Sequence, residues 1–132
     1  MTRARASPFL PAAVALHVGL LVIWLLPGPA TIGASLRVAS EAGTVLGGPR
    51  HPMALWALLN GVAAVLLLAG WARHARHLRL IGWVWGSAII TFLASTQWIT
   101  VARSPAGSLS GPLFTTTAVL AHIAAAWREA EG

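Results

Sequence analysis

The sequence predicts an all-α fold, a polytopic transmembrane bundle of four helices that forms one domain over residues 1–132. Three observations predict it: 57% of the residues are hydrophobic, the mean hydropathy is +0.74, and only 9% are charged. A soluble domain carries about a quarter charged residues, because its surface faces water. In addition, the apolar residues gather in long stretches divided by Pro, Gly and Arg, which predicts several helices rather than one.

Four apolar stretches are the predicted spans, at residues 8–26, 53–72, 80–102 and 112–127. An apolar helix needs about 20 residues to cross a hydrocarbon core of about 30 Å. The second and third stretches meet this length without a charge, whereas the first is slightly short and the fourth is shortest. The first stretch follows Arg3 and Arg5 and is similar to a signal peptide. Its long apolar run, ended by the turn Pro27-Gly28-Pro29, favours an uncleaved first span.

The segments between the stretches are predicted as two external loops and one tight link. Residues 27–52 and 103–111 are rich in proline and glycine, which favours loops outside the membrane. Within the first loop, residues 35–45 are compatible with a short surface helix. The link 73–79 is short and basic, so the second and third spans are expected to form an antiparallel hairpin.

Arginine placement predicts the orientation. With four spans, six arginines fall on the side of both termini and three on the other side. The positive-inside rule then places both termini in the cytoplasm. Tryptophans fall near the predicted ends of the spans, as expected for rings that favour the headgroup region. The six arginines are Arg3, Arg5, Arg73, Arg76, Arg79 and Arg128, and the other three are Arg37, Arg50 and Arg103.

Small residues mark candidate contact faces on the helices. Gly82 and Gly86 form a GxxxG motif in the third stretch, and Ala57 and Gly61 form a similar track in the second. Small side chains let two helix backbones approach closely. The motif fits helix packing within one chain and also fits a contact between copies in a homo-oligomer.

His17, His122 and Asn60 are candidate functional residues, because they are polar side chains well inside apolar stretches. The bland interpretation is interhelical hydrogen bonding between neutral side chains. The sharper one is that the two histidines hold a haem iron from opposite sides. At about 1.5 Å per residue, His17 lies about 14 Å from Pro8 and His122 about 8 Å from Trp127. This mismatch of about 6 Å in predicted depth argues against a haem.

The basic link holds Arg73, Arg76 and Arg79, which can bind anionic lipid headgroups at about 1 kcal/mol per cation. The alternative is that these arginines only set the topology of the chain. The chain has no cysteine, which excludes disulfides, iron–sulfur clusters and thiolate zinc. No catalytic triad, phosphate loop or zinc-ligand spacing is present, so we expect no enzyme, no metal site and no cofactor. The arginines flank apolar stretches, which favours a bilayer over nucleic acid as the partner.

The overall plan, with a tight basic hairpin, flanking tryptophans and short tails, resembles small four-span membrane proteins of GC-rich bacteria and their phages, among them holins. The resemblance implies a multi-pass protein of the inner (cytoplasmic) membrane that oligomerises and permeabilises the bilayer. The short tail Arg128-Glu129-Ala130-Glu131-Gly132 departs from the longer, charged tail of many holins. The alternatives are a structural or accessory subunit of a larger membrane complex, and a b-type haem protein using His17 and His122.

Overall fold

The computed structural model describes residues 7–25, 52–103 and 109–131. These residues form four α-helices and no strand: α1 (Leu10–Leu25), α3 (Pro52–Ala72), α4 (Arg76–Arg103) and α5 (Ser110–Glu131). The prediction of an all-helical chain is therefore confirmed for the described part. Two of the helices, over Ala54–Ala72 and Arg76–Arg103, are long and apolar enough to cross a membrane.

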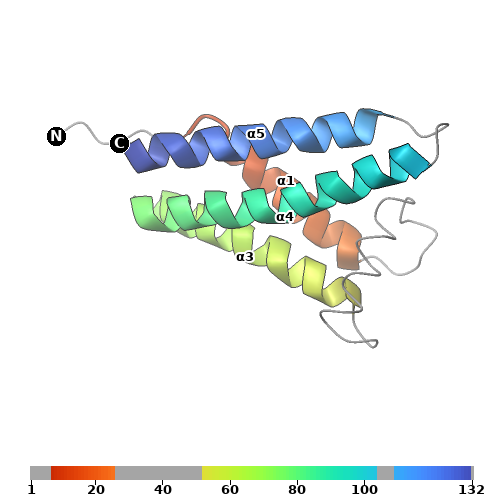
Figure 1. Ribbon diagram of the computed structural model, residues 1–132. Helices are drawn as coiled ribbons and strands as arrows, with labels where there is room; N and C mark the ends of the chain where they lie inside the picture. Colours follow the sequence, from red (N-terminus) through yellow and green to blue (C-terminus); the bar gives the residue numbers. More distant parts are fainter. Residues whose placement is uncertain (1–6, 26–51, 104–108, 132) are drawn as a thin grey trace.

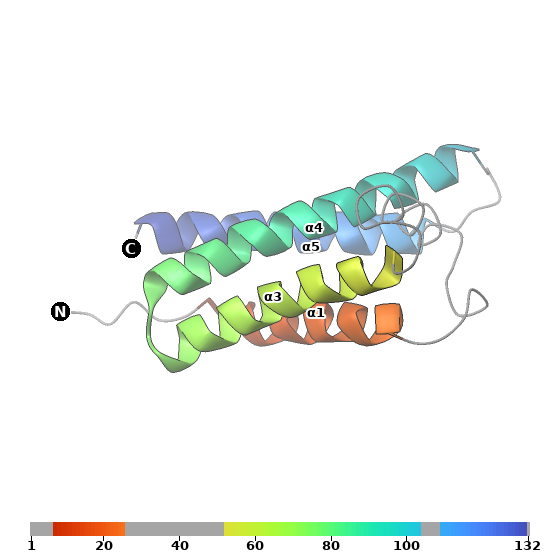
Figure 2. The ribbon, with the colours of Figure 1, turned by 90° about the horizontal axis from the view of Figure 1, so that it is seen from below.

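The helices pack mainly against their neighbours in the chain, in an elongated bundle (Figures 1 and 2). α1 lies against α3, α3 against α4 and α4 against α5, each through an extended interface. The backbones of α1 and α5 approach each other much less closely. The bundle therefore has three well-packed interfaces and one side, between its first and last helices, that is less tightly closed; we call this side the seam.

The link between α3 and α4 lies at the end of the bundle where α1 begins and α5 ends, which we call the hairpin end (Figure 1). The link is shorter than the predicted 73–79, because α4 already begins at Arg76. His74 turns the chain with a φ of 52°, in the left-handed region. A Cβ on Gly70 would lie 2.7 Å from the backbone nitrogen of Arg79. Only a glycine at position 70 lets α3 and α4 approach this closely.

The helix bounds differ from the predicted spans at several ends. α1 is shorter than the predicted 8–26, and α5 extends beyond the predicted 112–127 to Glu131. The extension has a physical cause, since Glu129 is buried against α4 and so continues the inward face of α5. Most of the predicted loops at 27–52 and 103–111, and the helix expected at 35–45, lie outside the described residues.

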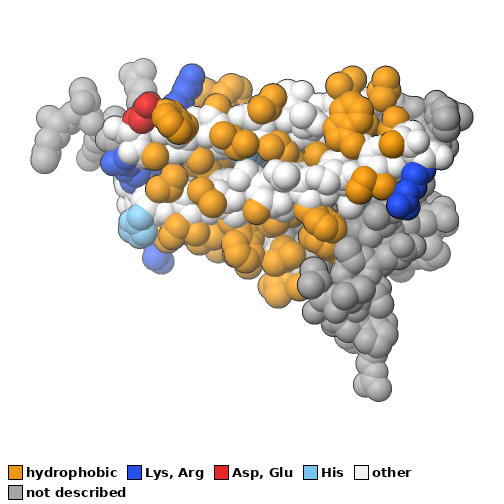
Figure 3. Space-filling view, viewed as in Figure 1, with side chains coloured by type: hydrophobic (Ala, Val, Ile, Leu, Met, Phe, Trp, Pro, Cys, Tyr) orange, Lys and Arg blue, Asp and Glu red, His pale blue; other side chains and the backbone are white. Residues whose placement is uncertain are grey.

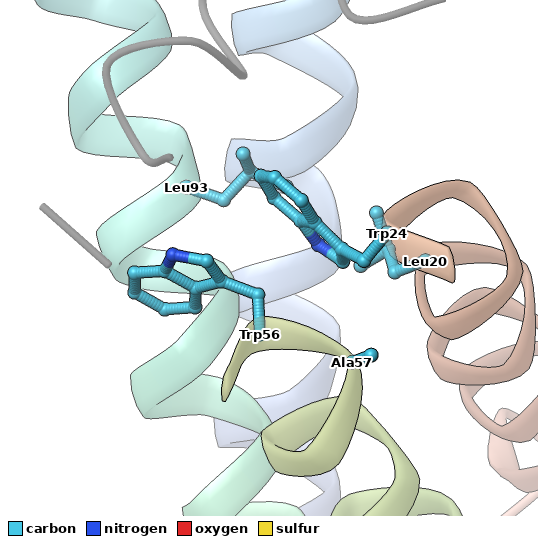
Figure 4. Close-up of a cluster of buried hydrophobic side chains, with 5 residues drawn as sticks. All are labelled: Leu20, Trp24, Trp56, Ala57 and Leu93. Atoms are coloured by element: carbon cyan, nitrogen blue, oxygen red, sulfur yellow. The ribbon is translucent and has the colours of Figure 1, made fainter. Parts of the chain in front are cut away.

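Two clusters of buried apolar side chains fill the bundle, one toward each end. The cluster at the end opposite the hairpin comprises Leu20, Trp24, Trp56, Ala57 and Leu93 (Figure 4). The cluster toward the hairpin end comprises Leu10, Ala13, Leu67, Trp83 and Ala125. Between them lies a small set of buried polar groups.

Three of the seven tryptophans lie inside the bundle, whereas the sequence analysis placed them only near the ends of the predicted spans. Trp24, Trp56 and Trp83 are buried inside the bundle, at 3%, 5% and 0% exposure. Trp56 stacks against Trp24 on one side and against Phe92 on the other, with ring centroids 6.1 and 4.9 Å apart. These rings therefore contribute to packing between the helices.

Candidate functional site

The polar groups between the two apolar clusters come from three helices. His17 from α1, Asn60 from α3 and His122 from α5 are all buried, at no more than 2% exposure. We call these three residues the histidine centre. They are the three intramembrane functional candidates of the sequence analysis, and the structure brings them into one connected group.

The two histidines of the centre meet through their Nε2 atoms, which are 3.2 Å apart. On the far side of His17, its Nδ1 lies 2.9 Å from the Oδ1 of Asn60. Asn60 in turn donates from Nδ2 to the backbone carbonyl of Trp56 at 2.9 Å. On the far side of His122, its Nδ1 lies 2.8 Å from the carbonyl of Ala118. A continuous chain of polar contacts thus crosses the bundle from α3 through α1 to α5.

The mismatch in depth predicted for the two histidines is wrong. The estimate for His122 was measured from Trp127, but α5 continues to Glu131. In the structure α1 begins at Leu10, seven residues before His17, and α5 ends at Glu131, nine residues after His122. The two Nε2 atoms are 3.2 Å apart, so the two side chains lie at the same level of the bundle.

The small residues of the predicted contact faces all lie inside the chain's own packing. A Cβ on Gly82 would lie 2.9 Å from a methyl carbon of Leu67, and one on Gly86 would lie 2.6 Å from His17 Nε2. A Cβ on Gly61 would lie 3.0 Å from a methyl carbon of Leu21. Ala57 belongs to the buried cluster of Figure 4. These positions serve helix packing within one chain; Ala57, Gly82 and Gly86 are buried, whereas Gly61 is partly exposed.

A crevice opens beside the histidine centre, on the seam between α1 and α5. Its volume is about 260 Å³ and its lining is almost entirely apolar. His122 lies at its inner wall together with Trp83, whose ring stands nearly perpendicular to the imidazole at a centroid distance of 5.1 Å. Among the described residues, the buried Nε1 of Trp83 has no hydrogen-bond partner. The crevice gives the His122 ring free space on one side.

A haem does not fit between the two histidines as they are packed. An iron held by both Nε2 atoms places the porphyrin plane across the line that joins them. That plane would run into the backbone of α4, because even a single Cβ on Gly86 would come within 2.6 Å of His17 Nε2. The observed geometry therefore brings the two predicted axial ligands together without leaving room for the macrocycle.

A second buried polar group lies at the hairpin end and joins α4 to α5. Arg79 donates from Nε and Nη2 to the two carboxylate oxygens of Glu129, at 2.7 and 2.9 Å, and from Nη1 to the carbonyl of Gly70. Both side chains are nearly fully buried, at 4% and 5% exposure. Arg76 donates to the carbonyls of Glu129 and Ala130 at the end of α5.

These contacts correct the prediction of a lipid-headgroup site only for Arg79, because its guanidinium is buried in the ion pair. Arg76 donates to the last turn of α5 but is exposed, as is Arg73. Sequence reasoning missed Glu129, because it ended the fourth span at Trp127. A signal was present, since Thr115, His122 and Glu129 recur every seven residues and all three are buried.

Comparisons with known proteins add nothing to this geometry: no family model matches the sequence, and no curated protein or solved structure is similar to it.

Proposed function

We propose that the chain is a multi-pass protein of a bacterial cytoplasmic membrane, crossing it four times with both termini in the cytoplasm. The outward faces of the helices support this placement. In the two helices that are long and apolar enough to cross a membrane, only 39% and 44% of the residues in the most apolar stretch are buried. Large apolar side chains such as Leu25, Leu58, Val65, Leu120 and Trp127 are more than 60% exposed. Lipid is the solvent that such a surface suits.

The distribution of charge supports the same placement. Along the visible face of the molecule, arginine and glutamate side chains lie at the two ends, and apolar side chains cover the length between them (Figure 3). Tags on the two termini test the topology. We expect both to report the cytoplasmic side, and reporters on opposite sides would contradict four spans.

Within the membrane, we propose that the protein acts as a non-enzymatic structural or accessory subunit of a larger complex. The observation that carries this proposal is the closed interior. The two apolar clusters lie between the histidine centre and the two ends of the bundle, so the described part of the chain offers no continuous polar path along it. What the molecule offers to other proteins is its broad apolar flank, on which transmembrane helices pack by close van der Waals contact.

Native extraction tests the subunit proposal. The tagged full-length chain is expressed at its natural level, extracted in mild detergent and separated by size. In a parallel experiment, expression is induced and the membrane potential of the host is measured. We expect a discrete complex with a second protein at fixed ratio, and an unchanged membrane potential on induction. A species built only of this chain, or a collapse of the potential, would contradict the proposal.

Holin-like permeabilisation by a homo-oligomer is the second candidate. One observation favours it: Ser87, Thr91 and Ser95 recur every fourth residue on the outward side of α4. The hydroxyls of Ser87 and Ser95 already donate to carbonyls within the helix, at 2.8 Å. Copies of the chain arranged with this face inward would line an opening with hydroxyl groups.

Induced expression separates the two candidates. If permeabilisation is the function, induction depolarises the membrane and Thr91→Leu delays the onset, because it replaces a hydroxyl with an apolar side chain. Val84→Leu is the matched control, since Val84 is also outward on α4 and stays apolar. Harmless high-level expression, or equal delays in both variants, would count against a holin.

A further inference from the structure

The two histidines of the centre point at each other head on. Their ring centroids are 5.3 Å apart although the Nε2 atoms are 3.2 Å apart. Most of the difference is the distance from each Nε2 to its own ring centre, so the two Nε2 atoms lie close to the line between the rings. The ring planes are perpendicular, at 90°. Whatever occupies the space between the Nε2 atoms is contacted by both rings along their in-plane axes.

The outer contacts fix where the ring protons lie. The amide of Asn60 is oriented by its donation to the Trp56 carbonyl, so its oxygen faces His17 and accepts from Nδ1. The Ala118 carbonyl has only lone pairs, so it likewise accepts from Nδ1 of His122. Both outer contacts therefore require the Nδ1–H tautomer.

A proton is missing from this network. A neutral imidazole carries one ring proton, so the two histidines carry two. The series of polar contacts that runs from Asn60 through His17 and His122 to the Ala118 carbonyl contains three contacts. With both protons on Nδ1, two Nε2 lone pairs face each other. An imidazole whose Nδ1–H is held by an amide or carbonyl oxygen, with Nε2 free, is the arrangement found in metal-ligating histidines.

We propose that His17 and His122 form a two-coordinate site for a single soft monovalent metal ion, Cu(I), held between their Nε2 atoms. Within the described residues, no three or more His, Cys, Asp or Glu side chains lie close enough together to hold one metal ion. A zinc ion, which takes four ligands, therefore has no complete site in this part of the chain. Imidazole is a suitable ligand for copper, and the monovalent ion needs neither carboxylates nor water.

The centre has the room that such an ion needs. Two metal–nitrogen bonds of about 2.0 Å each would place the Nε2 atoms about 4 Å apart, so the observed pair opens by less than about 1 Å. His122 can move, because it borders the crevice on the seam. The α1 and α5 backbones can also separate slightly, since they lack the extended contact made by the other helix pairs. The opposite wall, at Gly86, stays in place.

Metal titration of the purified full-length protein tests the proposal. Cu(I) is added without oxygen against a coloured chelator, and Ag(I) serves as a redox-inert substitute. We expect one ion per chain. Asn60→Leu removes the acceptor that orients His17 and should weaken binding about 10–100-fold. His17→Ala and His122→Ala each remove a ligand and should weaken it further. The paired variant His74→Ala with His77→Ala, on the exposed hairpin, is the control that keeps wild-type affinity.

A readout on the unmodified protein guards against variants that fail to fold. In ¹⁵N-histidine-labelled protein loaded with Ag(I), we expect the Nε2 signals of two histidines to be split by coupling to silver, while their Nδ1 signals stay protonated. The proposal is overturned if no ion binds, if the double variant His17→Ala with His122→Ala binds equally well, or if only hairpin histidines respond. It is also overturned if added haem gives a Soret band that requires both His17 and His122.

Discussion

The bundle contains two buried polar groups that differ in how completely they are satisfied. The Arg79–Glu129 ion pair joins α4 to α5, two helices that already pack closely, and its guanidinium finds acceptors for three of its nitrogens. The histidine centre joins α1 to α5 across the seam, where the backbones are less closely packed, and it has fewer protons than contacts. The comparison teaches that burial alone does not mark a functional site. A saturated network has no free donor or acceptor to offer, whereas an unsaturated one can accept a ligand.

The largest effect should come from breaking the ion pair. Arg79→Met leaves the Glu129 carboxylate buried without its partner, which costs about 3–5 kcal/mol. Unfolding in mixed detergent micelles, followed by circular dichroism, measures the loss. Arg73→Met, at an exposed position, is the control and should change little.

The paired replacement Arg79→Met with Glu129→Leu sharpens this result. It removes both charges at once, so most of the stability should return. A double variant as unstable as the single one would show that the ion pair itself, rather than the unpaired carboxylate, accounts for the loss.

A smaller effect is expected at the wall of the histidine centre. Gly86→Ala introduces a Cβ 2.6 Å from His17 Nε2, and such overpacking costs about 1–3 kcal/mol. Gly19→Ala is the matched control in a helix interior, because nothing lies within 4 Å of its added Cβ. If Gly86→Ala and Gly19→Ala have the same free energy of unfolding in the same assay, the histidines are not held against α4 as described.

The hydrogen bond of Asn60 should contribute less than either of these. Asn60→Leu removes the acceptor of His17 Nδ1, and side-chain hydrogen bonds between membrane helices average about 0.6 kcal/mol, with a maximum of about 1.7. The ¹⁵N spectrum of His17 should change from one dominant tautomer to a mixture of two. An unchanged spectrum would mean that Asn60 does not set the position of the proton.

The smallest effect serves as a reference for polar contacts outside the core. Trp98 donates from Nε1 to Thr116 Oγ1 at 3.0 Å, between α4 and α5 and at an exposed position. Thr116→Val removes this acceptor and should cost no more than the average of about 0.6 kcal/mol. If Thr116→Val lost as much free energy of unfolding as Arg79→Met, buried and exposed polar contacts would contribute equally to stability, contrary to the comparison of the two buried groups.

The sequence predicted the helices well because apolar length is a local property. Each of the four apolar stretches corresponds to a helix, with ends that differ by a few residues. It also singled out His17, His122 and Asn60, since a polar side chain in an apolar stretch is visible without a structure. It did not predict that the three would meet, because the depths of the two histidines were measured from predicted span ends, and both of those ends differ from the ends of the helices.

The ion pair was not predicted from the sequence for a different reason. Arg79 lies in a basic segment and Glu129 in a polar tail, so each by itself indicates a solvated position. Only the close approach of α3 and α4 at Gly70, and the packing of α5 along α4, bury them together. Likewise, the interfacial preference of tryptophan is a property of single rings, and it gave no sign that Trp24, Trp56 and Phe92 stack on one another.

The position of the seam has a consequence for biosynthesis. Among the described helices α1 is made first and α5 last, so His17 is made more than a hundred residues before the residue that faces it. Until α5 is complete, His17 has Asn60 as its neighbour but nothing opposite its Nε2. The pair therefore assembles only after α5 has been made, and a chain that stops before His122 lacks the centre even if α1, α3 and α4 are already in place.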